Sequence, residues 1–257
     1  MIRALTICLL LVSVVSCTSE GPRRSEVEPT GPPTVQVGDV EAHAAQFDDE
    51  VPERPAGTQN EEAASVYLLG HLQRAGYVVR LDAVPVGNLV RSTNVVAVPP
   101  SAEDPVAVVA VAYDTPEDAE PRGESLGLFL ELARALRVAV PEHLVEFAAL
   151  GAEHAQASDG QLGSRRLIRG LLDDDLDPAM IVLEVIQEDT GFSARGPAAP
   201  ALNEVAEGSG VEIPPSPLKT LPSDEFWLRS GLEFAVVSGS AEDVGTVLLE
   251  YLAERGR

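Results

Sequence analysis

The stretch Val145–His154, with the sequence VEFAALGAEH, places an apolar run directly before two polar residues. Residues 145–150 are almost entirely apolar, which is typical of a parallel strand that is covered on both faces. Glu153 and His154 follow this run. Ligands of open α/β sheets bind at the carboxyl ends of the strands. We therefore expect a central strand at 145–150, with Glu153 and His154 at a candidate site.

Strand and helix patterns alternate on both sides of this stretch. Short apolar runs predict strands, and apolar residues spaced three and four apart predict helices. The predicted strands are 77–83, 92–98, 106–112, 145–150, 180–186 and 233–237, and the predicted helices are 40–47, 59–75, 126–138, 162–172, 199–207 and 243–254. This alternation predicts an α/β fold, a three-layer sandwich with a mostly parallel central sheet.

Two of the predicted helices begin with capping signals. Asp39 precedes the helix expected at 40–47, where its carboxylate can accept a backbone N–H. Thr58 and Glu61 have the spacing of a capping box, in which each side chain bonds the backbone of the other.

The chain is strongly acidic, with a formal net charge of -23 over 257 residues. Nucleic-acid binding needs clustered Lys and Arg that neutralise phosphates, so this charge argues against a nucleic-acid partner. It also disfavours direct adhesion to anionic lipid headgroups. Because 45% of the residues are hydrophobic, the chain can bury a sizeable core.

The amino-terminal residues have the pattern of an exported protein. Arg3 precedes an apolar run at 5–15, which has the length of a signal-peptide core and is too short to span a bilayer. The sequence VVSC at 14–17 resembles the bacterial lipobox. We therefore expect lipid attachment at Cys17 and a location in the bacterial cell envelope. The alternative is an ordinary signal peptide that contains Cys17.

The chain is expected to have three parts: a lipoprotein signal peptide at 1–16, a flexible tether at 17–37 and one domain at 38–257. The tether is rich in Ser, Glu, Gly and Pro, a composition that favours a flexible segment. Cys8 and Cys17 are the only cysteines, and Cys8 would leave with the signal peptide. The cysteine count therefore excludes a disulfide within the mature chain and a cysteine-based metal site.

Short segments of the domain resemble the zinc-dependent aminopeptidases of the co-catalytic dizinc type, whose relatives include leucyl aminopeptidases and glutaminyl cyclases. The segments are RPAGT at 54–58, TNVVA at 93–97, AYD at 112–114, LELARAL at 130–136, FAALGAE at 147–153, GS at 163–164, IVLE at 181–184 and SDE at 223–225. They extend over nearly all of the domain, so the resemblance implies a zinc-exopeptidase-like fold.

The resemblance also implies two zinc ions bridged by a carboxylate and a hydroxide, with a glutamate as general base. Glu153 stands at the position of the base, and Asp114 at the position that orients the first ligand histidine. Ala112 replaces that histidine and has no atom that binds a metal. The bridging aspartate falls at Arg122 or Gly123, neither of which can bridge cations. We therefore expect no two-metal site.

Three residues remain as candidate ligands of at most one zinc ion: His154, Glu184 and Asp224. Glu225 is the alternative to Asp224. A histidine and two carboxylates are a donor set that zinc accepts. The other interpretation is that Glu153 and His154 are ordinary strand-end residues, hydrogen-bonded to a nearby carboxylate.

The missing ligands favour a membrane-anchored pseudoenzyme whose cleft binds a peptide or a protein partner. The alternative is a divergent single-metal aminopeptidase or cyclase that processes peptide amino termini, with Glu153 as base. A third interpretation is an envelope protein whose cleft holds no ligand.

Several other residues match no ligand position of the resemblance. His43, His71 and His143 are expected at the surface. Phe226 and Trp227 are expected either to line a pocket or to pack in the core, since aromatic residues beside a strand do both.

Overall fold

The computed structural model describes residues 33–87, 89–101, 103–116, 123–155, 160–186, 191–214 and 224–256. The predicted signal peptide, Cys17 and Arg122 therefore lie outside the described residues.

A seven-stranded sheet of order β1-β2-β4-β3-β5-β7-β6 forms the middle layer of the described part of the chain. Its strands are β1 (Val78–Pro85), β2 (Arg91–Val98), β3 (Ala107–Ala112), β4 (Val145–Leu150), β5 (Ala179–Ile186), β6 (Ser193–Arg195) and β7 (Phe234–Gly239). The four central strands pair in parallel, whereas β1, β2 and β6 join through antiparallel pairings. Because β1 reverses the direction of β2, only β2 and β6 oppose the others. The predicted mostly parallel sheet is confirmed.

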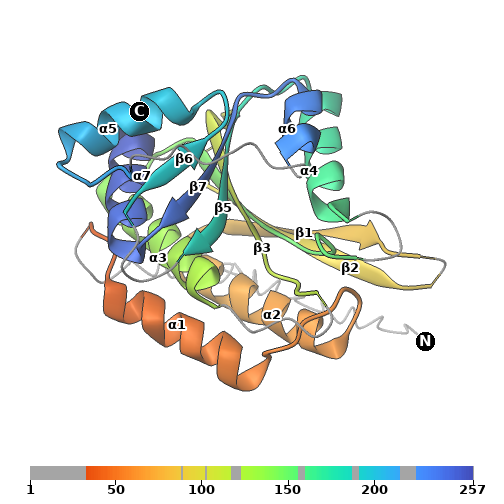
Figure 1. The fold of residues 1–257 in the computed structure, drawn as a ribbon. Helices are drawn as coiled ribbons and strands as arrows, with labels where there is room; N and C mark the ends of the chain where they lie inside the picture. Colours follow the sequence, from red (N-terminus) through yellow and green to blue (C-terminus); the bar gives the residue numbers. More distant parts are fainter. Residues whose placement is uncertain are drawn as a thin grey trace, which may run out of the picture.

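Helices cover both faces of this sheet. Within the described ranges they are α1 (Val37–Glu50), α2 (Gln59–Arg74), α3 (Glu124–Ala139), α4 (Leu162–Asp173), α5 (Ala199–Gly208), α6 (Asp224–Ser230) and α7 (Ala241–Arg255). Figure 1 shows α4 and α6 on one side of the sheet and the other helices on the opposite side. The predicted three-layer sandwich is thus confirmed. None of these described helices is long and apolar enough to cross a membrane.

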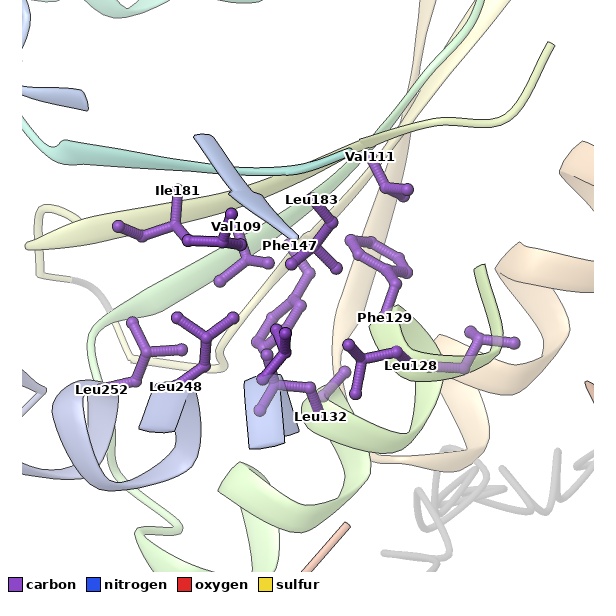
Figure 2. Packing of buried hydrophobic residues seen from close by; sticks show 14 of the residues in the cluster. Val109, Val111, Leu128, Phe129, Leu132, Phe147, Ile181, Leu183, Leu248 and Leu252 are labelled. Carbon is purple, nitrogen blue, oxygen red and sulfur yellow. The ribbon is translucent and has the colours of Figure 1, made fainter. Parts of the chain in front are cut away.

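The core consists of two apolar layers separated by the sheet, because successive strand residues point to opposite faces. Val109 of β3 packs in the larger cluster with Phe129 and Leu248, whereas Val108 packs in the smaller cluster with Leu167 of α4. Figure 2 shows the larger cluster between the strands and helices α3 and α7. Burying one such side chain contributes about 1.5–3 kcal/mol, so these layers fix the strands whose ends form the site.

Two details of the predicted helix starts are wrong. Helix α1 begins at Val37, earlier than expected, and Asp39 lies inside it instead of capping it. Thr58 caps α2 as predicted, but Glu61 does not bond the Thr58 backbone. Its carboxylate accepts the N–H of Gly57 instead, because the chain turns one residue before the cap.

Strand β6 and helix α6 are the two described elements that the sequence pattern did not predict. The strand is the one that carries Arg195. It has three residues, too few to show the alternation that identifies a strand. It pairs antiparallel with β7, and Arg195 lies opposite Val236. This pairing places Arg195 on an edge strand of the sheet, level with Val236 of β7 and Val182 of β5.

Candidate functional site

A cavity of about 590 Å³ lies at the carboxyl ends of the parallel strands. The residues that line it come from strands β3 to β7, from helices α3 and α6, and from loops near these strand ends. They are Arg54, Val111, Ala112, Asp114, Thr115, Pro116, Ser125, Leu150, Glu153, His154, Gln161, Val182, Leu183, Glu184, Arg195, Asp224, Trp227 and Val236. The site expected from residues 145–154 is therefore a cleft, and it contains all the candidate residues Asp114, Glu153, His154, Glu184 and Asp224.

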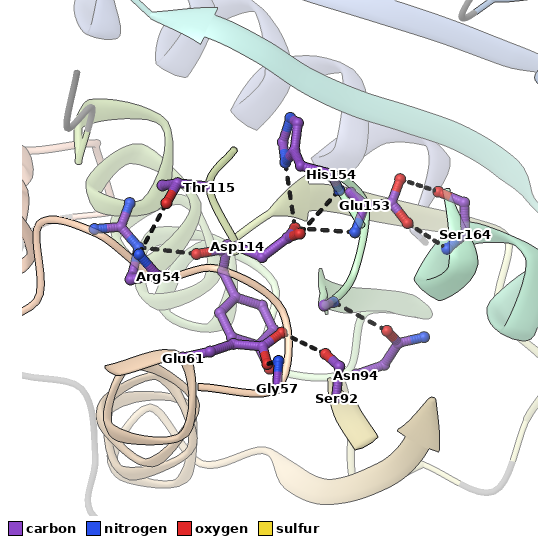
Figure 3. Close-up of polar contacts among 12 residues, drawn as sticks. Arg54, Gly57, Glu61, Ser92, Asn94, Asp114, Thr115, Glu153, His154 and Ser164 are labelled. Carbon is purple, nitrogen blue, oxygen red and sulfur yellow. Dashed lines mark hydrogen bonds and ion pairs between the residues drawn. The ribbon is translucent and has the colours of Figure 1, made fainter. Parts of the chain in front are cut away.

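Asp114, just beyond β3, fixes the loop that follows β4. Its two carboxylate oxygens accept the backbone N–H groups of Glu153 and His154 at 3.0 and 2.8 Å. The His154 ring contacts the same carboxylate, with 3.3 Å between Nδ1 and Oδ1 (Figure 3). The hydrogen bond from His154 to a nearby carboxylate, which one of the two interpretations expects, is therefore present.

Glu153 turns its carboxylate toward the start of α4 rather than toward the carboxylates across the cleft. The backbone N–H of Ser164 donates to one oxygen at 2.6 Å, and the Ser164 hydroxyl donates to the other at 2.7 Å (Figure 3). Donors at a helix amino terminus stabilise a carboxylate. Glu153 therefore binds protein groups with both oxygens.

Close backbone packing sets the path of this loop. A Cβ atom at Gly151 would lie 2.1 Å from Ser92 Oγ, and one at Gly163 would lie 2.4 Å from the carbonyl oxygen of Gly151. Asn94, fully buried on β2, accepts the N–H of Gly151 at 3.1 Å and donates to the carbonyl of Gly163 at 2.9 Å. Ala152 has a φ of 56°, a left-handed conformation that costs a non-glycine residue about 1–3 kcal/mol.

Across the cleft, Arg195 joins two carboxylates from different elements. Its Nη1 and Nη2 donate to the two oxygens of Glu184 on β5, each at 2.7 Å. Its Nε donates to Oδ2 of Asp224, the first residue of α6, at 2.8 Å. The side chain of Arg195 is 5% exposed and that of Asp224 is 3% exposed. We call Glu184, Arg195 and Asp224 the arginine cluster.

The two sides of the cleft perturb their ionisable groups differently. Burial raises the pKa of Glu153 to about 7, although the Ser164 hydrogen bonds oppose this change. Burial lowers the pKa of His154, but the hydrogen bond to Asp114 and its charge outweigh burial, so the pKa is raised. Burial also lowers the pKa of Arg195, and the bonds to Glu184 and Asp224 more than reverse this, so the guanidinium stays charged.

Arg54 is a second arginine at the cleft that had no expected role. It is 2% exposed, and its Nε donates to the carbonyl of Tyr113 at 2.9 Å. Its backbone N–H donates to the Thr115 hydroxyl at 2.8 Å (Figure 3). These bonds hold the segment around Asp114 in place.

Three of the expected departures at the metal positions have clear local structures. Ala112 ends β3 and lines the cleft without a donor atom. A Cβ atom at Gly123 would lie 2.4 Å from the carbonyl oxygen of Ala44, so α1 leaves no room for a side chain there. Glu225 is exposed and pairs with Arg229, which leaves Asp224 as the carboxylate of α6 that faces the cleft.

The expected surface location of three histidines is wrong. His143 is fully buried, because the Tyr77 hydroxyl and the backbone N–H of Val145 satisfy its two ring nitrogens. His43 and His71 are half-buried, with ring centroids 4.6 Å apart. Trp227 lines the cleft and also packs in the smaller cluster.

Solved structures with a similar arrangement are zinc-dependent exopeptidases and glutaminyl cyclases. The glutaminyl cyclase of an Acidobacteriales bacterium is 16% identical, with a TM-score of 0.70 over 88% of this chain and 96% of that one. A leucine aminopeptidase precursor from Bacteroides thetaiotaomicron is 17% identical, with a TM-score of 0.70 over 87% and 98%. A Zn-dependent exopeptidase from Parabacteroides distasonis is 14% identical, with a TM-score of 0.66 over 87% and 99%. The chain has the zinc-exopeptidase fold. Neither a scan of protein-family models nor a comparison with curated proteins finds a match.

The donor atoms that the described residues place in this cleft do not fit a zinc ion. The described residues contain no group of three or more His, Cys, Asp or Glu side chains arranged to hold a metal. The expected ligands His154, Glu184 and Asp224 all line the cleft, but they do not converge. The first contacts Asp114, and the other two bind Arg195.

Proposed function

We propose that this protein is a catalytically degenerate form of the zinc exopeptidases, a pseudoenzyme whose cleft binds a peptide or a protein partner. The observation that carries the proposal is the arginine cluster. Glu184 and Asp224 are the carboxylates that the resemblance assigns to zinc, and both are ion-paired with Arg195 at 2.7–2.8 Å. Ala112 supplies no replacement ligand.

The shape and chemistry of the cleft support a binding role. A volume of about 590 Å³ falls in the range of about 300–1,000 Å³ that is usual for ligand sites. Its wall includes apolar Val182, Val236 and Trp227, together with charged groups of both signs. Such a surface suits a peptide, which presents apolar side chains along with backbone and terminal polar groups.

The proposal is tested by metal analysis of the purified protein and by its hydrolysis of aminoacyl-nitroanilides. The expected result is substoichiometric zinc and no turnover above background. Stoichiometric zinc, with turnover that disappears in Glu153→Gln, contradicts the proposal.

Ligand binding has a direct readout in this chain. Trp227 is the only tryptophan, and it lines the cleft. A peptide that enters the cleft is therefore expected to change the intrinsic fluorescence. A peptide library that gives no saturable change, at concentrations up to millimolar, favours a cleft without a peptide ligand.

The second candidate is a single-metal aminopeptidase or cyclase, and one observation favours it. The pKa of Glu153, raised by burial to about 7, suits a general base at neutral pH. This candidate requires Glu184 and Asp224 to leave Arg195 and bind zinc with His154. It predicts that zinc raises the melting temperature and that His154→Ala abolishes the increase.

We also propose that the protein is exported and held at the bacterial envelope by lipid on Cys17. The support is the VVSC sequence after a short apolar run. Several acyl chains hold a protein firmly, since each buried methylene contributes about 0.8 kcal/mol. Metabolic labelling with a palmitate analogue is expected to tag the wild-type chain but not Cys17→Ser. Equal labelling of both contradicts lipid attachment at this residue.

A further inference from the structure

The arginine cluster has the geometry of a cation site whose cation belongs to the chain. Three N–H groups of Arg195 reach three carboxylate oxygens at 2.7–2.8 Å. Glu184 is bound through both oxygens, the two-pronged arrangement in which a guanidinium binds a carboxylate most strongly. The three residues come from β5, β6 and α6, so the guanidinium joins three separate elements.

The burial of the two carboxylates favours a cation between them. The side chain of Asp224 is 3% exposed, and the Glu184 side chain is 34% exposed. Two carboxylates that lie this close repel each other, and a cation between them relieves the repulsion. The other basic groups that line the same cavity bond elsewhere: Arg54 donates to the Tyr113 carbonyl and His154 contacts Asp114.

We infer that Arg195 replaces a metal ion: its guanidinium compensates Glu184 and Asp224 and keeps divalent cations from binding between them. This inference rests on the proposed function in one respect, since both require that no metal ion bind between Glu184 and Asp224 in the wild type. It goes further because it assigns the compensating charge to one residue. It also predicts a latent site, meaning that Glu184 and Asp224 bind a divalent cation once the Arg195 side chain is removed.

The chemistry of the latent site follows from the remaining atoms. Removing the guanidinium leaves carboxylate oxygens from Glu184 and Asp224, a donor set that suits Mn²⁺ and that Zn²⁺ also accepts. Truncation at Cβ also opens space for the water molecules that complete the coordination of such an ion.

The test measures the melting temperature of the full chain against MnCl₂ and ZnCl₂ up to millimolar concentration. Arg195→Ala is expected to gain about 5–10 °C at a hundredfold excess of cation over its Kd. The wild type is expected to gain nothing. Arg229→Ala serves as the matched control, because Arg229 pairs with Glu225 on the exposed face of α6 and its side chain is 79% exposed.

A second variant tests whether an increase in melting temperature comes from a cation bound at the arginine cluster. Arg195→Ala combined with Glu184→Gln is expected to lose the cation response, since one carboxylate remains. The inference is overturned if Arg195→Ala folds and shows no shift with either cation. It is also overturned if the double variant or Arg229→Ala responds as strongly as Arg195→Ala.

If the Arg195→Ala variant does not fold without metal, its refolding is an equally decisive experiment. Refolding is then carried out with and without millimolar MnCl₂. Recovery that depends on the cation supports the inference, and a failure to recover overturns it.

Zinc binding by the wild type distinguishes a failure of this inference from a failure of the proposed function. Stoichiometric zinc bound by the wild type, lost in His154→Ala but kept in Glu184→Gln, contradicts the proposed function and leaves the arginine cluster intact. A zinc site in the wild type that is lost in Glu184→Gln contradicts both.

Discussion

The two sides of the cleft hold their charged groups by different means. On the side of β3 and β4, Asp114 and Glu153 bind backbone N–H groups and a serine hydroxyl. On the side of β5 and α6, Glu184 and Asp224 bind another charged side chain, Arg195. The first side depends on the shape of a loop, and the second depends on ion pairs with Arg195. A substitution of one residue should therefore disrupt the second side more than the first.

The largest expected effect is that of Arg195→Ala on stability. Removing one partner of a buried ion pair leaves uncompensated charge and costs about 3–5 kcal/mol of unfolding free energy. Urea unfolding of both proteins at neutral pH measures the difference. The control Arg229→Ala, which breaks an exposed pair, is expected to cost about 0–1 kcal/mol. Equal losses in the two variants contradict the comparison.

Asp114→Asn is expected to have the next largest effect. A neutral amide offers one acceptor oxygen to two backbone N–H groups, which costs about 1.5–3 kcal/mol. The pKa of His154 should also fall, because the hydrogen bond and the charge that raise it are weakened. NMR titration of the His154 ring follows this change. Asp177→Asn, at an exposed carboxylate, is the control for both measurements.

Glu153→Gln tests the pH dependence of the same side. Burial raises the pKa of Glu153 to about 7 in the folded protein, above its ordinary value near 4.5. The folded state therefore binds the proton more tightly, and the stability it gains below about pH 4.5 is lost as the pH rises through 7. Relative to Glu153→Gln, the wild type should lose stability between pH 4.5 and pH 7. Parallel curves for the two proteins across this range contradict the assignment.

Ser164→Ala is expected to have the smallest effect of the four. It removes the hydroxyl that donates to Glu153 at 2.7 Å but keeps the backbone N–H, so the cost is about 1 kcal/mol. The pKa of Glu153 should rise further, because the Ser164 hydrogen bonds lower it. The pH dependence of unfolding then shifts to higher pH. An unchanged midpoint would mean that the Ser164 hydroxyl does not affect the pKa of Glu153.

The first side of the cleft was predictable from the sequence because its parts are local. The apolar run 145–150 predicts β4 with its observed bounds, and Glu153 and His154 follow within four residues. Their partner Asp114 follows the earlier apolar run, 106–112, in the same way. Strand ends in a parallel sheet meet at one edge, so the sequence pattern alone brings these residues together.

The second side was not predictable, because its central residue gives no local signal. Arg195 lies on a three-residue strand and is separated from its partners by 11 and 29 positions. Nothing in that spacing indicates that a guanidinium reaches both carboxylates. The prediction of a surface location for His143 was wrong for a similar reason, since its buried partner Tyr77 lies 66 positions away. The sequence offers one indirect signal. When the other metal ligands are missing, the remaining carboxylates need a different cation, and an arginine can supply it.

The arginine cluster also changes how the cleft depends on its environment. A zinc ion is present only in the fraction of molecules that free metal can load, and a chelator removes it. The guanidinium of Arg195 is covalently part of every copy, in a fixed ratio of one to one. Dilution, chelation or scarcity of trace metals therefore leaves Glu184 and Asp224 equally compensated. The state of this cleft is decided when the chain folds, not when it encounters an ion.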